Sequence, residues 1–89
     1  MNEINQKLAE IGRNWEVVDG TKLRRVFEFK GFLKTMSFVN AVAWVANKQM
    51  HHPDMEVSFN KCVINITTHD EGNSLTEKDF KLAKAIAEL

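Results

Sequence analysis

The stretch that most constrains the fold is residues 31–50, which read as one long helix between two hairpin signals. Placed ~100° apart, its apolar residues cover roughly half of the helix circumference, which is wider than the stripe of an ordinary surface helix. We therefore expect the helix to cover a sheet with one side and to contact something else with part of the other. The apolar set is Phe32, Met36, Phe38, Val39, Val42, Ala43, Val45, Ala46 and Met50.

Two turn signals predict the strands on either side of this helix. Asp19-Gly20 is typical of a two-residue hairpin turn, and Asn60-Lys61 suits one because Asn tolerates a positive φ. The segments that these turns join are strand-like in composition or alternation, and they comprise residues 15–18, 23–30, 55–59 and 62–68.

Short helices are predicted at both ends of the chain, over residues 3–11 and 75–88. Thr76 is placed as the N-cap of the second, with Asp79 in its third helical position. The resulting order is α-β-β-α-β-β-α, which predicts a single α+β domain over residues 1–89. We expect a four-stranded antiparallel sheet with three helices on one face, while its other face needs a partner or meets water.

Leu33 and Trp44 lie apart from the apolar arc of the long helix, among polar residues. Trp44 either packs under the N-terminal helix or belongs to a subunit interface, where aromatic residues are enriched. The wide arc and the uncovered sheet face both favour self-association into a homodimer or a larger assembly.

Composition excludes several classes of function. Twelve basic residues balance twelve acidic ones, which argues against nucleic-acid binding through phosphate attraction and against a role on a membrane surface. No apolar run approaches the ~18–20 residues that span a bilayer, and no secretory signal is visible. The one cysteine, Cys62, suits a reducing compartment and is expected to be buried packing. We expect a soluble cytoplasmic protein.

The chain has three histidines, His51, His52 and His69. If Asn60-Lys61 forms the turn, Phe59 faces Cys62 across the hairpin. The same register makes His52 face His69 and His51 face Asp70, with opposed Cβ atoms ~4.5–5.5 Å apart. A bulge at Pro53 would shift this pairing but keep the histidines near one another.

Two other interpretations remain open for the histidines. They could be separate surface residues, or they could bind zinc, although the usual spacings of zinc ligands are absent. Gathered in one place, they could perform acid–base chemistry without a metal or cofactor, because imidazole titrates near pH ~6.5.

The chain resembles the pterin-4a-carbinolamine dehydratase family, also called dimerisation cofactor of a homeodomain transcription factor. The resemblance covers nearly the whole chain, and two departures from the family pattern are Asn47, where an acidic residue is usual, and Met55, where Trp is common. The segments that carry the resemblance are Val45-Ala46, His51-His52-Pro53-Asp54, Phe59-Asn60-Lys61, Thr67-Thr68-His69-Asp70 and Leu75-Thr76-Glu77-Lys78-Asp79.

The resemblance implies a dehydratase that converts 4a-hydroxytetrahydropterin to quinonoid dihydropterin and water in tetrahydrobiopterin recycling. It assigns proton transfer to His51 and His69, and it assigns His52 to orienting the pterin and sharing in catalysis. The resemblance implies no metal and no cofactor, and a homodimer or homotetramer. The alternative is a non-catalytic dimerisation or binding module of the same fold that acts as a protein cofactor. The expected substrate contacts are His51, His52, Pro53, Thr68, His69, Asp70 and Glu71.

Overall fold

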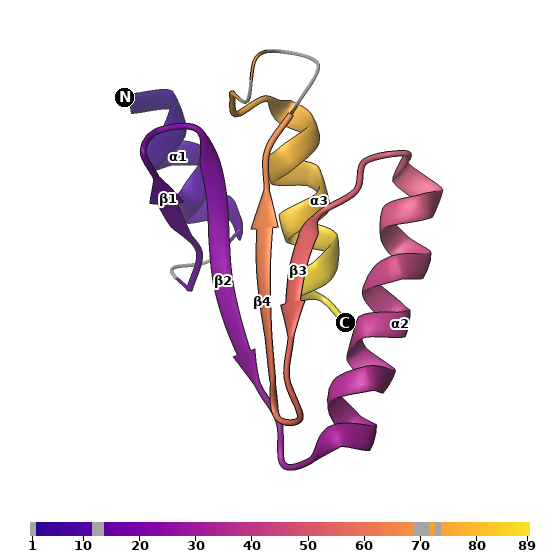
Figure 1. Ribbon diagram of the computed structural model, residues 1–89. Helices are drawn as coiled ribbons and strands as arrows, with labels where there is room; N and C mark the ends of the chain where they lie inside the picture. Colours follow the sequence, from indigo (N-terminus) through magenta and orange to yellow (C-terminus); the bar gives the residue numbers. More distant parts are fainter. Residues whose placement is uncertain (1, 12–13, 69–71, 73) are drawn as a thin grey trace.

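The computed structural model describes residues 2–11, 14–68, 72 and 74–89. Within these residues the chain forms three helices and four strands in the predicted order (Figure 1). The elements are α1 (Asn2–Ile11), β1 (Glu16–Val18), β2 (Lys22–Glu28), α2 (Phe32–Gln49), β3 (Asp54–Val57), β4 (Lys61–Ile66) and α3 (Glu77–Ala87).

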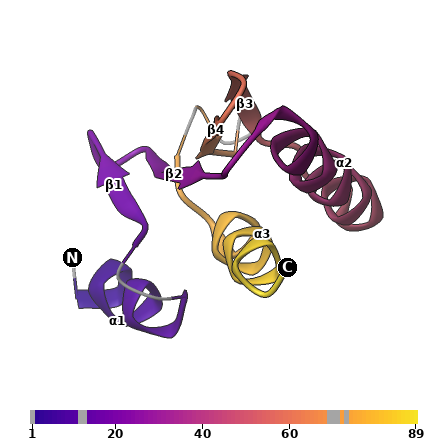
Figure 2. The same ribbon diagram turned by 90° about the horizontal axis from the view of Figure 1, so that it is seen from below.

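The strands form one antiparallel sheet in the order β1-β2-β4-β3, so the two hairpins meet through β2 and β4. The helices pack on one side of this sheet, with α3 in contact with both α1 and α2 (Figure 2). This arrangement confirms the predicted α+β fold.

Side-chain alternation along β4 positions the core. Cys62, Ile64 and Ile66 are fully buried, whereas the intervening Val63 and Asn65 are half-buried, which is the period of two expected of a strand. Leu23 of the neighbouring strand β2 belongs to the same core, and so do Leu82, Ala83 and Ile86 of α3. Burial raises the pKa of the Cys62 thiol, because a thiolate is poorly solvated there. Cys62 is therefore a packing residue rather than a nucleophile.

The first hairpin has the predicted turn. Asp19 and Gly20 both have positive φ, at 55° and 69°, and Thr21 N–H donates to the Val18 carbonyl at 3.0 Å. Two positive φ angles in succession define the turn whose twist matches that of the flanking strands.

The second hairpin corrects the predicted register. Val57, not Phe59, faces Cys62, and Met55 faces Ile64, so every partner is two positions away from the prediction. The turn residues are Phe59 and Asn60, because Ser58 N–H donates to the Lys61 carbonyl at 2.9 Å.

Tertiary hydrogen bonds explain the placement of this turn. The buried Thr35 hydroxyl of α2 donates to the Phe59 carbonyl at 3.0 Å, and Phe29 N–H donates to the Asn60 carbonyl at 2.8 Å. A shift of two residues keeps the alternation of faces, so the buried face of β4 stays in the core. Phe59, however, enters the turn and is 66% exposed. The β3–β4 ladder begins at Asp54 and Asn65, and the predicted facing of His51 and His52 is therefore not found in it.

Helix α2 confirms the predicted span, but the division of its residues into buried and exposed ones differs from the prediction. Thr35, Val42 and Ala46 are buried against the rest of the fold. Several predicted apolar positions are instead exposed, among them Phe32, Ala43 and Met50. Trp44 is 67% exposed and has the Lys48 ammonium 4.9 Å from its ring centroid. The interpretation that Trp44 packs under the N-terminal helix is wrong.

Helix α2 ends at a residue in the left-handed conformation. Glycine is usual at such a position, but here the residue is Met50. Met50 has φ 55° and ψ 37°, with its N–H donating to the Asn47 carbonyl, and His51 N–H donates to the Ala46 carbonyl at 3.1 Å. These two bonds are the pattern of a Schellman cap. A residue with a Cβ is strained in this conformation, so the cap directs the chain toward His51 at some cost in stability.

We expect Met50→Gly to raise the free energy of unfolding by about 0.5–1 kcal/mol, because glycine adopts positive φ without steric strain and Met50 is mostly exposed. Urea denaturation followed by far-UV circular dichroism measures the change. Met50→Ala is the matched control, since it removes the side chain but keeps the Cβ and should give no gain. Equal stability of the two variants would contradict strain at this cap.

Candidate active site

The site is organised around Asp79, a carboxylate in the first turn of α3 that is fully buried. Its Oδ1 accepts a hydrogen bond from His51 Nε2 at 2.7 Å. Its Oδ2 accepts from Thr68 Oγ1 and from Thr76 N–H, both at 2.8 Å. Both carboxylate oxygens therefore have hydrogen-bond partners.

The hydroxyl groups around Asp79 form a consistent chain of donors. Thr68 Oγ1 donates to the carboxylate and lies 2.7 Å from Thr76 Oγ1, so Thr76 is the donor between the two hydroxyls. Thr76 Oγ1 in turn accepts from Lys78 N–H at 3.3 Å. Each buried polar group in this hydrogen-bond network has a partner, which is the condition for burying a carboxylate away from water.

Three separate parts of the fold bring these groups together. His51 follows the cap of α2, Thr68 follows the end of β4, and Asp79 with Thr76 begins α3. The Thr67 hydroxyl holds the β4 end in place by donating to the Thr21 carbonyl at 2.6 Å. The His51 side chain is 11% exposed, so it is buried on its Asp79 side and still accessible from the surface.

The predicted site residues are placed unequally. His51 and Thr68 meet at Asp79, Pro53 is half-buried, and His52 is exposed beside them in the chain. Residues 69–71, which include the predicted His69, Asp70 and Glu71, lie outside the described part of the chain. The proximity of His69 to His51 stays a prediction.

The direct contact between Asp79 and His51 is absent from the sequence prediction. The sequence indicated Asp79 as a match to a family position and as a helix N-terminal carboxylate. The second role is confirmed, since a complete capping box joins Thr76 and Asp79. The carboxylate performs both tasks because its two oxygens point to different partners. A separation of 28 residues from His51 carries no local pattern, and family position was the available signal.

Within the described residues, no group of three or more His, Cys, Asp or Glu side chains is arranged to hold a metal ion. Over the same residues, none of the helices has both the length and the apolar character needed to cross a membrane.

Comparison with known proteins identifies the family of this chain. The chain matches the family described as pterin 4 alpha carbinolamine dehydratase over residues 1–89. The chain belongs to this family. A protein from Trichodesmium erythraeum, provisionally named pterin-4-alpha-carbinolamine dehydratase, is 45% identical over 89 residues, which cover 100% of this chain and 92% of the relative. A protein of the same name from Legionella pneumophila (strain Corby) is 43% identical over 88 residues, covering 98% of this chain and 77% of the relative.

Solved structures agree with the pterin dehydratase fold. A crystal structure described as a transcriptional coactivator/pterin dehydratase from Brucella melitensis superposes with a TM-score of 0.89 at 33% identity, covering 98% of this chain and 92% of that one. A pterin dehydratase-like protein described as a RuBisCO assembly factor in the alpha-carboxysome has a TM-score of 0.73 at 16% identity, covering 88% of this chain and 90% of that one. The second likeness concerns the fold alone.

Two departures from the usual pattern of pterin dehydratases can now be placed. Asn47 is exposed on α2, one turn before His51. Met55 faces Ile64 across the hairpin and packs against the core. Neither residue takes part in the hydrogen bonds around Asp79, so these bonds form without the usual acidic residue and Trp.

Proposed function

We propose that this chain is a dehydratase acting on 4a-hydroxytetrahydropterins by histidine acid–base catalysis. The C4a–O bond breaks as the leaving hydroxyl takes a proton and departs as water. The N5–H proton goes to a base, and the C4a–N5 double bond of the quinonoid dihydropterin forms. The observation that carries this proposal is the hydrogen bond from His51 to the buried Asp79, in a chain that belongs to this family.

The bond to Asp79 favours His51 as the base. A carboxylate only accepts, so the neutral His51 ring carries its proton on Nε2 and leaves Nδ1 as an unprotonated acceptor. Once Nδ1 takes a proton, the Asp79 carboxylate stabilises the imidazolium, as a buried carboxylate does in other acid–base sites.

The other roles follow the family resemblance. His69 would protonate the departing hydroxyl, and His52 would orient the pterin ring and share in proton transfer. Pro53, Thr68, Asp70 and Glu71 would contribute to pterin contacts. We place the reaction in tetrahydrobiopterin recycling and in the cytoplasm, a reducing compartment that suits the single thiol of Cys62.

His51→Ala and His69→Ala should each lower the rate of dehydration of 4a-hydroxytetrahydropterin at least ~100-fold, the scale of general acid–base catalysis. Stopped-flow absorbance of the quinonoid product measures the rate. Lys48→Ala, an exposed change one turn from His51 on α2, should retain the wild-type rate. A wild-type rate in either histidine variant would refute its assignment, and a wild-type protein no faster than the uncatalysed reaction would refute the enzyme.

Asp79→Asn tests whether the carboxylate acts through His51 or only caps α3. We expect it to lower kcat about 10-fold or more, because the amide no longer enforces the His51 tautomer or stabilises its charged form. Thr76→Ala is the matched control. It should lower stability by about 1 kcal/mol through loss of the cap while kcat falls less than about threefold. Equal losses of kcat in two folded variants would assign Asp79 a structural role alone.

The second candidate function is a non-catalytic dimerisation or binding module, and the surface of α2 favours it. Leu33 is 80% exposed and Trp44 is 67% exposed. Eleven residues separate them, which is close to three helical turns, so both lie on one face of α2. We infer that this Leu33–Trp44 face is where copies of the chain associate, an inference that is compatible with catalysis in each copy.

Self-association predicts that light scattering of the purified chain at micromolar concentration gives at least twice the monomer mass of 10.2 kDa. Trp44→Glu should reduce this mass to that of the monomer, because a charge in the centre of an apolar contact opposes association. Lys81→Glu, an exposed change on α3, should leave the assembly intact. A wild-type monomer, or a Trp44→Glu variant that still associates, would contradict this interface.

A further inference from the structure

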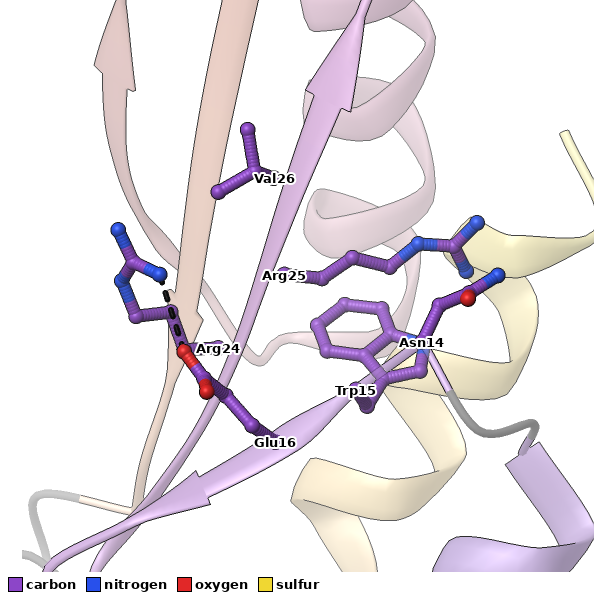
Figure 3. Close-up of a pocket in the computed structure, with 6 residues that line it drawn as sticks. All are labelled: Asn14, Trp15, Glu16, Arg24, Arg25 and Val26. Carbon is purple, nitrogen blue, oxygen red and sulfur yellow. Dashed lines mark hydrogen bonds and ion pairs between the residues drawn. The ribbon is translucent and has the colours of Figure 1, made fainter.

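A polar cavity of about 530 Å³ lies at the β1 edge of the sheet (Figure 3). It shares no residue with the hydrogen bonds around Asp79. The cavity lies where β1 begins: the β1–β2 ladder reaches only as far as Glu16 and Arg24, whereas β2 continues to pair with β4 as far as Glu28. The residues that line it are Asn14, Trp15, Glu16, Arg24, Arg25 and Val26.

Trp15 contributes a buried donor without an acceptor. Its side chain is 3% exposed, and its Nε1 is buried with no hydrogen-bond partner. Leaving such a group unpaired is costly, and native proteins rarely do so without a reason. In Figure 3 the Asn14 amide and the Arg25 guanidinium lie on the same side of the indole ring.

Arg25 contributes a cation held by aromatic rings. Its guanidinium carbon lies 4.2 Å from the Phe27 ring centroid and 5.8 Å from that of Trp15, and no ion pair to it is formed by the described residues. Burial lowers the pKa of Arg25, because its charge is partly removed from water. The neighbouring Arg24 differs, since its Nη1 is 3.0 Å from Glu16 Oε1.

We propose that this cavity binds an oxyanion, the carboxylate or phosphate group of a small molecule, through Arg25, Asn14 and Trp15. The planar guanidinium matches the two oxygens of such a group. The Arg25 side chain is long and flexible, and its movement off the indole ring lets an anion oxygen reach the Trp15 Nε1–H. Among the described residues that line the cavity, Glu16 carries the one carboxylate, and its pairing with Arg24 reduces its repulsion of the anion.

The test is a titration of the whole chain with inorganic phosphate and, separately, with succinate, at constant ionic strength maintained with chloride. Nitrogen–proton NMR spectra resolve the indole N–H signals of the two tryptophans. We expect a saturable shift of the Trp15 signal with at least one of the anions, while the exposed Trp44 signal is unchanged. Saturation by phosphate alone, by succinate alone or by both identifies the anion class.

Arg25→Gln should weaken this binding at least ~10-fold, the loss expected for one charge-assisted hydrogen bond. Lys34→Gln is the matched control and should change the affinity less than about threefold, because this exposed cation on α2 does not line the cavity. If Arg25→Gln does not give a folded spectrum, Arg25→Lys replaces it, with an expected loss of at least ~3-fold through loss of the bidentate geometry.

Three results would overturn the proposal. The first is the absence of a saturable shift at about 50 mM of either anion, a concentration above the weak millimolar range of dissociation constants. The second is an equal shift of the Trp15 and Trp44 signals. The third is an unchanged affinity in the folded Arg25 variant. None of these measurements uses dehydratase activity, so the oxyanion site and the proposed dehydratase function are tested independently.

Discussion

The position of the candidate active site depends on the hydrogen bonds of the buried Asp79. A carboxylate without water is stable only when its oxygens are paired, and here the partners come from three different elements. His51 ties the end of α2 to it, Thr68 ties the end of β4, and Thr76 ties the start of α3. Loss of one partner would leave a buried charge poorly compensated. The end of α2, the end of β4 and the start of α3 are therefore held in one arrangement. A rigid arrangement of this kind is what acid–base chemistry needs, because proton transfer depends on hydrogen-bond distance.

The remaining structure supports this junction from the opposite ends of the same elements. The Thr35 hydroxyl joins α2 to the turn between β3 and β4, far from the histidines along α2. The left-handed Met50 then directs the chain from α2 to His51. Helix α2 is thus tied at both ends, which leaves its Leu33–Trp44 face exposed between them. A fold of this type can carry a catalytic site and a binding surface at once, since a fold does not by itself define a function.

Much of the fold follows from local patterns of a few adjacent residues in the sequence. The Asp19-Gly20 turn, the span of α2 and the Thr76 cap were all predicted, because each depends on backbone preferences of a few adjacent residues. The register of the second hairpin was predicted wrongly, with Asn60-Lys61 as its turn instead of Phe59-Asn60. Either pair suits a turn locally, and the choice is made by Thr35 and Phe29, which lie more than twenty residues away.

The sequence by itself determined the order of the elements, the buried face of β4 and the family, since these depend on periodicity and on short motifs. It also indicated His51 and Thr68 as site residues, through the resemblance. Only the tertiary structure decided that Asp79 is the partner of His51, that Trp44 is exposed, and that Arg25 lies beside the unpaired indole of Trp15. Each of these is a relation between residues on different elements or between a residue and solvent. Such relations are set by how elements pack, which no local pattern of residues records.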